Sequence, residues 1–286
     1  MIDIYKRTEL VSLLNRHKFS LSKGLGQNFL TDRNIIKKIT DALLITEEDL
    51  LVEVGAGAGT LTKSLSETAG SVVSVEIDSK VIPILNEVLG ETANISIINE
   101  DFLKVDLKKL TGGKPYKVIG NLPYYITSPI IMKVLEQDVK ADMIVFMVQK
   151  EVAGRLAAKV GTKDYGILTV AVNYYCDVEY LFTVSNEVFF PKPKVDSAVI
   201  RMIPHSKPPV DLIDEKVFFE VIKAGFGQRR KMLGNALKQI RDLNSEEVKS
   251  ALSDSGIQAS RRAETLDISE FARLSNSVTL LLRNKT

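Results

Sequence analysis

The tetrapeptide Asn121-Leu122-Pro123-Tyr124 has the residue types needed to hold a planar base that carries an exocyclic amine. The amide oxygen of Asn121 can accept one N–H bond from such an amine. The carbonyl oxygen of Leu122, kept open by Pro123, can accept the other. The ring of Tyr124 can stack on the base, and two acceptors on one amine direct its lone pair toward an electrophile. An ordinary turn is the alternative interpretation, because Asn and Pro are both favoured turn residues.

Alternating apolar and helical segments place this tetrapeptide directly after a buried strand. The strands are expected at residues 50–54, 71–76, 95–98, 116–120, 143–148, 178–184 and 197–203. The helices are expected at residues 8–18, 32–44, 60–68, 79–89, 128–136, from 150 onward and at 165–175. Such alternation predicts an α/β fold with a mostly parallel sheet that is covered on both faces.

A proline-rich stretch at residues 204–209 marks a change of character, because only helical patterns follow it. Ser245 is expected to open one of these helices, and Asp267 with Glu270 three residues later predicts a capping box for the last one. We therefore expect a catalytic domain over residues 1–204, with a helical extension over residues 1–45. A small all-helical domain is expected over residues 205–286.

A glycine-rich turn between the first strand and its helix predicts a nucleoside-binding site. Gly55 and Gly57 let the backbone approach a ligand, and the following helix N-terminus offers N–H groups. Glu76 ends the second strand, where its carboxylate can accept both ribose hydroxyls. Asp101 ends the third strand and can accept an adenine amine, with Phe102 beside the ring. A plain tight turn and a solvated loop acid are the alternatives for the glycines and for Asp101.

The composition is that of a soluble globular protein. Lys and Arg number 38 against 36 Asp and Glu, so the net charge of +2 neither requires nor excludes a nucleic-acid partner. Cys176 is the single cysteine, which excludes an internal disulfide and fits a reducing cytosol. With His17 and His205 far apart in sequence, we expect no metal site. No signal peptide or membrane span is expected, and we expect a cytoplasmic monomer.

The ordered motifs resemble the ribosomal RNA adenine N6-dimethyltransferases over nearly the whole chain, and most closely their bacterial small-subunit branch, which is linked to kasugamycin sensitivity. The motifs lie at residues 27–30, 53–59, 76, 100–102, 121–124, 189–199, 229–237 and 262–264. The resemblance implies a Rossmann-like methyltransferase sheet with a helical C-terminal domain. It also implies S-adenosylmethionine as the methyl donor.

The resemblance further implies the reaction and its site. Two methyl groups would be transferred to N6 of each of two adjacent adenosines in the hairpin loop near the 3′ end of small-subunit rRNA, within the small ribosomal subunit or its precursor. The implied donor contacts are Asn28, Leu30, Gly55, Glu76, Asp101 and Asn121. Phe189 is the candidate for the second face of the target base, with core packing as the alternative.

Contacts with RNA are less specific in the sequence. Lys18 and Lys23 near the N-terminus, and the run Arg229, Arg230 and Lys231 at the start of an expected helix, could bind phosphates. A solvated surface charge is the alternative for each of them. Three other functions remain open: a dinucleotide-dependent oxidoreductase, a ribosome-assembly factor with a vestigial core, and a large-subunit rRNA methyltransferase of the erythromycin-resistance type.

Overall fold

The structure is a computed structural model that describes residues 2–228, 230–240 and 243–285. The chain divides into two compact units. The first comprises Met1–Ala153 and Val178–Pro204, and the second comprises Gly154–Asp177 and His205–Thr286. The division after Pro204 coincides with the boundary expected from sequence, but residues 154–177 belong to the second unit. They do so because Tyr165, Val170 and Tyr174 lie in the apolar core of that unit.

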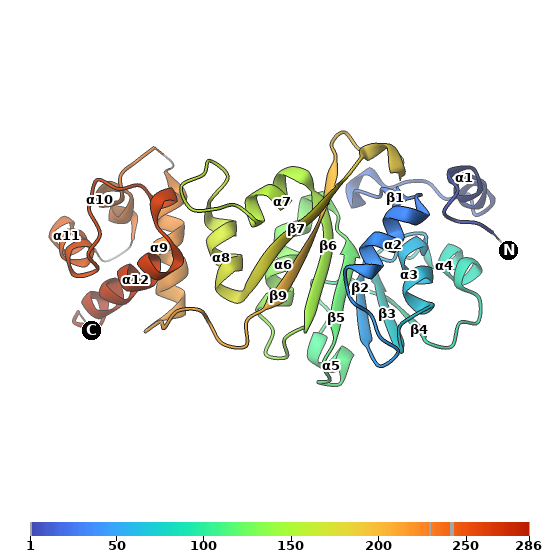
Figure 1. The fold of residues 1–286 in the computed structure, drawn as a ribbon, viewed down its shortest axis with the longest axis horizontal. Helices are drawn as coiled ribbons and strands as arrows, with labels where there is room; N and C mark the ends of the chain where they lie inside the picture. Colours follow the sequence, from blue (N-terminus) through green and yellow to red (C-terminus); the bar gives the residue numbers. More distant parts are fainter. Residues whose placement is uncertain (1, 229, 241–242, 286) are drawn as a thin grey trace. The chain divides into compact units, whose positions relative to one another are not determined.

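A seven-stranded sheet with the order β4-β3-β2-β5-β6-β9-β7 forms the centre of the first unit (Figure 1). Its strands are β2 (Leu50–Val54), β3 (Ser71–Glu76), β4 (Ile95–Asn99), β5 (Lys117–Asn121), β6 (Met143–Gln149), β7 (Cys176–Val184) and β9 (Ser197–Pro204). Strands β2 to β6 pair in parallel, and β9 pairs antiparallel with β6. The predicted mostly parallel sheet is therefore confirmed.

Helices pack on this sheet through apolar stripes. On one face, α2 (Arg33–Asp41) and α3 (Thr60–Ser66) share a core with β2, β3 and β5 (Figure 1). The helix α4 (Ile82–Leu89) buries Leu85 and Leu89 against the glycine turn, and α6 (Thr127–Leu135) buries four apolar side chains. The remaining helices of the first half of the chain are α1 (Arg7–Arg16), α5 (Leu107–Thr111) and α7 (Lys150–Leu156).

A second, two-stranded sheet joins segments that are far apart in the chain. In it β1 (Phe29–Leu30) pairs antiparallel with β8 (Phe189–Phe190), which sets Leu30 opposite Phe189. The sequence analysis did not predict these strands, because two residues carry no periodicity. Only the distant pairing defines them.

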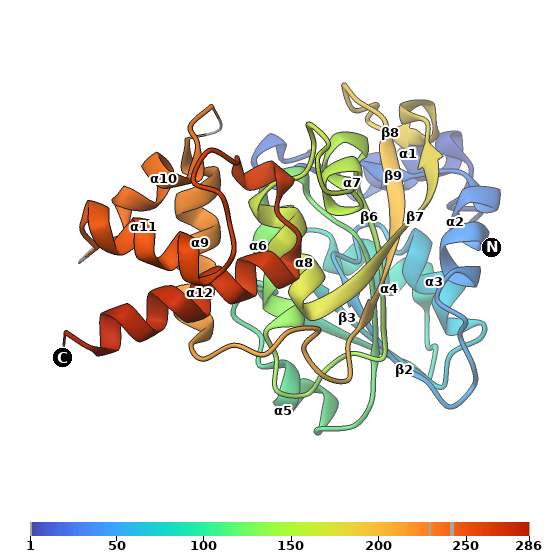
Figure 2. The ribbon, with the colours of Figure 1, turned by 60° about the vertical axis from the view of Figure 1, so that its left-hand side comes forward.

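The second unit contains five α-helices in the part that the structure describes. They are α8 (Ile167–Tyr175), α9 (Glu215–Gly227), α10 (Leu233–Ala236), α11 (Ser245–Asp254) and α12 (Ile268–Arg283). Helix α12 packs against α9 and α11 (Figure 2). The predicted capping box of Asp267 and Glu270 is confirmed. Helix α11 begins at Ser245 as expected, although its N-cap is Asn244. Among the described residues, no helix is long and apolar enough to cross a membrane.

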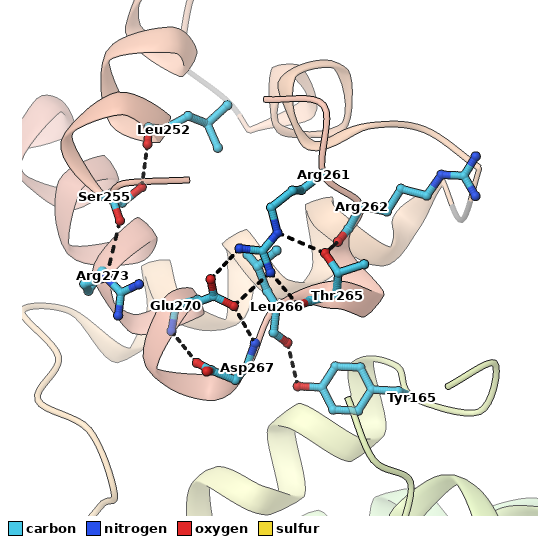
Figure 3. Close-up of polar contacts among 10 residues, drawn as sticks. All are labelled: Tyr165, Leu252, Ser255, Arg261, Arg262, Thr265, Leu266, Asp267, Glu270 and Arg273. Atoms are coloured by element: carbon cyan, nitrogen blue, oxygen red, sulfur yellow. Dashed lines mark hydrogen bonds and ion pairs between the residues drawn. The ribbon is translucent and has the colours of Figure 1, made fainter. Parts of the chain in front are cut away.

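A polar network stabilises the start of α12 (Figure 3). Arg261 forms an ion pair with Glu270 and also donates to Thr265. The hydroxyl of Tyr165 donates to the carbonyl oxygen of Leu266 at 3.0 Å. The Arg261 guanidinium lowers the pKa of the Glu270 carboxyl, so this acid is held ionised by a partner within its own unit.

Candidate active site

A cleft in the first unit lies at the carboxyl ends of β2, β3, β4 and β5. It encloses about 1130 Å³ of space, part of which is open to solvent. The predicted residues that line it are Asn28, Leu30, Gly55, Gly57, Glu76, Asp101, Phe102, Asn121, Leu122, Pro123 and Tyr124. Strand β2 starts the sheet and has β3 on one side and β5 on the other, so strand order reverses here. Open α/β sheets bind ligands at such a switch point.

The glycine turn approaches the cleft with backbone alone. Gly57 has a φ of +54°, and a Cβ built on it would lie 3.2 Å from the ring of Phe29. A side chain there would be strained and would meet that ring. The amide N–H of Gly57 already donates to Glu76 Oε2 at 2.8 Å, and that of Gly55 donates to Val75 O. The turn therefore uses these two N–H groups to position the end of β3.

Glu76 is held in the cleft by backbone donors. Its side chain accepts from Gly57 N and, through Oε1, from Asp78 N at 2.8 Å. Burial raises the pKa of this carboxyl, and these N–H groups oppose the shift. Each carboxylate oxygen retains a further lone pair that could accept from a ligand hydroxyl. The predicted position of this acid at the end of β3 is confirmed.

Asp101 lies at the same edge, after β4. Its Oδ1 accepts from Leu103 N at 3.0 Å, which fixes the carboxylate at the start of a turn. The neighbouring Phe102 is buried and also lines the cleft. Ile77, which directly follows Glu76, also lines the cleft and has 49% of its surface exposed. The sequence analysis assigned no role to Ile77, although an exposed apolar residue directly after a buried strand was the available signal.

Glu53 is a second buried acid, behind the glycine turn. It is fully buried, and its Oε2 accepts from Thr62 at 2.6 Å and from Ser74 at 2.5 Å. Its Oε1 is buried without a hydrogen-bond partner. Burial raises the pKa of Glu53 to about 7. Neither Glu53 nor Glu76 has an ion-pair partner among the described residues, so this part of the site is poor in positive charge.

The other end of the cleft is the Asn121 corner. The Nδ2 of Asn121 donates to the carbonyl oxygen of Asn28 at 2.9 Å, and among the described residues nothing donates to its Oδ1. Leu122 N donates to Met147 O at 3.0 Å, and within the described ranges nothing donates to the Leu122 carbonyl oxygen. Gly120 brings β5 close to β2, since a Cβ there would lie 2.6 Å from Val54 O. Asn121 and Leu122 both line the cleft, and their role as acceptors for a substrate amine stays a prediction.

Of the two predicted stacking residues, Tyr124 lies in the lining and Phe189 does not. The Tyr124 hydroxyl is 2.8 Å from Ser197 Oγ, which holds the ring at the cleft. Phe189 is fully buried and packs in the same core as Leu30. The predicted second stacking residue, Phe189, therefore lies outside the cleft lining in this structure, with its ring packed in the apolar core. Tyr125, which sequence analysis passed over, lines the mouth with 56% of its surface exposed.

Comparison with known proteins shows the family. The sequence model described as "Ribosomal RNA adenine dimethylase" matches residues 18–280. The chain belongs to this family. It is thus an rRNA adenine dimethyltransferase of the Rossmann-like methyltransferase class. It is 46% identical over 277 residues to "Ribosomal RNA small subunit methyltransferase A" of Clostridioides difficile, covering 96% of each protein. It is 48% identical over 289 residues to the protein of the same name from Geobacillus thermodenitrificans, covering 98% of this chain and 99% of that protein.

Solved structures of other rRNA adenine dimethylase relatives have the same architecture. A dimethyladenosine transferase from Plasmodium falciparum is similar with a TM-score of 0.75 and 26% identity, over 90% of this chain and 98% of that chain. The 23S rRNA methyltransferase ErmE is similar with a TM-score of 0.67 and 27% identity, over 88% of this chain and 99% of that chain.

Membership of the rRNA adenine dimethylase family implies S-adenosylmethionine as the methyl donor, and the cleft fits such a group. The donor is a nucleoside that carries a positive charge. The cleft offers Glu76 and Asp101, which form no ion pair with any described residue, together with an apolar lining and the glycine turn. Among the described residues, no group of three His, Cys, Asp or Glu is placed to hold a metal ion.

Of the candidate RNA-binding residues, Lys18, Arg230 and Lys231 lie outside the cleft lining. Lys18 is exposed in a turn after α1, with a φ of +50°. Lys23 begins a short 3₁₀ helix, and Arg229 lies outside the described residues. Arg230 and Lys231 are exposed, but they lie in a turn before α10, so the expectation that they open a helix is wrong.

The turn with Arg230 and Lys231 adjoins a second basic segment in the same unit. Leu233 N donates to Arg261 O at 2.8 Å, which brings this turn beside Arg262. The Arg262 side chain extends away from the Glu270 network (Figure 3) and is 52% exposed. The Leu233–Arg261 hydrogen bond thus links the chain segment that follows Lys231 to the segment that contains Arg262, a pairing that the sequence alone did not show.

Proposed function

We propose that this protein transfers methyl groups from S-adenosylmethionine to N6 of two adjacent adenosines in the 3′-terminal hairpin loop of small-subunit rRNA. The names of the relatives that are 46% and 48% identical support the small-subunit assignment. The observation that carries the proposal is one cleft lined by Asn121 and Leu122, whose oxygens accept from no described residue, and by Glu76 and Asp101, which form no ion pair with any described residue.

The donor would be held along the carboxyl edge of the sheet. Glu76 would accept the ribose hydroxyls, Asp101 would accept the adenine amine, and Phe102 with Ile77 would contact the adenine ring. Asn28, Leu30, Gly55, Gly57 and Asn121 would complete the binding site. When bound, S-adenosylmethionine supplies a methyl group that is already activated by its sulfonium. The protein therefore needs no strong nucleophile of its own.

Asn121 and Leu122 would orient the methyl acceptor, which is the N6 amine of the target adenosine. The Asn121 amide oxygen and the Leu122 carbonyl oxygen would each accept one N6 hydrogen, which keeps the nitrogen lone pair out of conjugation and aims it into the cleft. The same two dipoles would stabilise the positive charge that develops on N6 as the N–C bond forms. The proton would leave to water afterwards. Tyr124 would stack on the base, and buried walls around it would exclude water.

The target adenosine must leave its stack to enter this cleft. A hairpin-loop nucleotide costs less to extrude than a paired one, which fits a loop substrate. Arg230, Lys231 and Arg262 would contact phosphates of the RNA, with Lys18 and Lys23 as further candidates. We propose the domains over residues 1–204 and 205–286 as the catalytic and the RNA-binding parts. We also propose that the enzyme acts as a cytoplasmic monomer and contributes to small-subunit biogenesis.

The test is methyl transfer from labelled S-adenosylmethionine to purified small and large ribosomal subunits that lack the modification. Label recovered as N6-dimethyladenosine at two adjacent positions of small-subunit RNA is the expected result. Label only in large-subunit RNA would assign the protein to the activity named for ErmE, the structural relative. Donor binding without transfer to either subunit would overturn the catalytic proposal in favour of an assembly factor.

A further inference from the structure

The segment of residues 22–28, here called the cover segment, is tied to the donor end of the cleft by one side chain. The Nε2 of Gln27 donates to Asp78 Oδ2 at 2.7 Å, across 51 positions of sequence. Its Oε1 accepts from Ser22 N at 2.9 Å, so the two ends of one amide serve different partners. Gln27 lines the cleft, and Asp78 is only 8% exposed.

Asp78 continues this connection to the acid expected to hold the ribose. Asp78 N donates to Glu76 Oε1 at 2.8 Å, while Gly57 N donates to Oε2. The other oxygen of Asp78, Oδ1, accepts from Lys80 N at 3.1 Å. Every polar atom in this path has a specific partner, so the orientation of Glu76 and the position of the cover segment depend on one another.

The neighbours of Gln27 contact the opposite, acceptor end of the cleft. A Cβ built on Gly26 would lie 3.6 Å from the ring of Tyr125 and 3.8 Å from Pro123, which shows how closely the backbone passes. The carbonyl oxygen of Asn28 accepts from Asn121 Nδ2 at 2.9 Å. Residues 26–28 thus connect Glu76, which would bind the methyl donor, with Asn121, whose amide would hold the N6 amine of the target adenosine.

We infer that Gln27 is a positioning residue whose hydrogen bond to Asp78 couples donor binding to the placement of Asn121. This inference rests on the proposed methyl donor. With the bond formed, the cover segment lies over the donor, and Asn28 fixes the Asn121 amide with its oxygen toward the acceptor. A side-chain amide suits this position, because residue 27 both accepts from Ser22 N and donates to the Asp78 carboxylate.

The hydrogen-bond requirements allow a double-mutant test by isothermal titration calorimetry with S-adenosylmethionine. Gln27→Glu places a carboxylate against Asp78, and Asp78→Asn places an amide N–H against the Gln27 N–H, so each single change breaks the bond. In Gln27→Glu/Asp78→Asn, the amide at position 78 donates to the carboxylate at position 27 and still accepts from Lys80 N. We expect each single variant to bind the donor at least about tenfold more weakly. The double variant should return to within about threefold of wild type.

Gln27→Met keeps the length of the side chain without its hydrogen bonds and should weaken binding like the single variants. Thermal unfolding of all four variants checks that the fold is retained. In rate measurements, loss of the bond should raise the donor KM and also lower kcat, because Asn121 loses its fixed partner. A merely structural role would change the stability of the variants without changing donor affinity or kcat.

The outcomes separate this inference from the proposed donor. No binding of S-adenosylmethionine by the wild-type protein overturns both. Wild-type binding with a double variant as weak as the weaker single variant, or with Gln27→Met unchanged, overturns the coupling alone.

Discussion

Glu76 and Glu270 are the same residue type in opposite electrostatic settings. In the first unit, Glu76 accepts only from backbone N–H groups, and burial raises its pKa. In the second unit, Glu270 pairs with Arg261, and its pKa is lowered. An acid whose charge is already neutralised by a cation has little left to offer a ligand. The first unit thus leaves Glu76 available to a positively charged ligand, while the second unit uses Glu270 to stabilise its own fold.

The largest effect on activity should come from removing the Asn121 amide, which is expected to bind the substrate amine. Asn121→Ala removes the amide oxygen expected to accept from N6, so kcat should fall by about 100- to 1000-fold. The donor dissociation constant should change much less. Initial rates of methyl transfer measure the first quantity, and calorimetry measures the second.

The matched control is Asn284→Ala, which changes an exposed asparagine at the end of α12. It should leave kcat unaltered. An equal loss of activity in Asn121→Ala and Asn284→Ala would contradict the prediction that Asn121 acts in the reaction.

Glu53, a second buried acid without an ion-pair partner among the described residues, should make the free energy of unfolding depend on pH. Its folded pKa of about 7 lies above the ordinary value of 4.5, so the native state binds more protons than the unfolded state between these two pH values. The free energy of unfolding should therefore fall as pH rises through this window, by up to about 3 kcal/mol from this group. Glu53→Gln cannot ionise and should lose that part of the pH dependence, with a constant offset from the altered hydrogen bonds.

Urea unfolding of wild type and Glu53→Gln at several pH values between 4.5 and 8 measures this difference. Parallel pH profiles for the two proteins would show that Glu53 does not titrate in this window.

Arg261 and Arg262 allow a test of whether an ion pair stabilises the second unit. Arg261→Ala removes the ion pair with partly buried Glu270 and should lower the free energy of unfolding by about 2 kcal/mol. Arg262→Ala removes a side chain that is 52% exposed, with its nearest acid oxygen 4.0 Å away, and should change stability little. Urea unfolding measures both, and RNA-binding assays should show the reverse order of effects.

The smallest effect is expected at the mouth of the cleft. Tyr125→Ala removes an exposed ring that could stack on a nucleotide beside the target, and should raise the KM for RNA by about three- to tenfold. Tyr125→Phe keeps the ring and should behave like wild type. Donor affinity serves as the control, because a change there would mean that the cleft itself was disturbed.

Much of the fold was predictable because its signals are local. The apolar runs at residues 50–54 and 71–76 became β2 and β3 with unchanged limits. The Asp267 capping box was readable because its two partners are three residues apart. Asp101 and Asn121 could be assigned to one cleft, since parallel strands bring their carboxyl ends to the same edge of a sheet.

Sequence by itself determined the order along the chain of the seven main-sheet strands, the glycine turn, and the positions of Glu76, Asp101 and Asn121 at the strand ends. Only the tertiary structure decided that Phe189 is buried, that residues 154–177 belong with the helical unit, and that Gln27 bonds Asp78. The physical reason is the range of the interactions. Periodicity, capping and turn chemistry act over a few residues, whereas burial and side-chain pairing depend on surfaces that distant segments form only when they pack together.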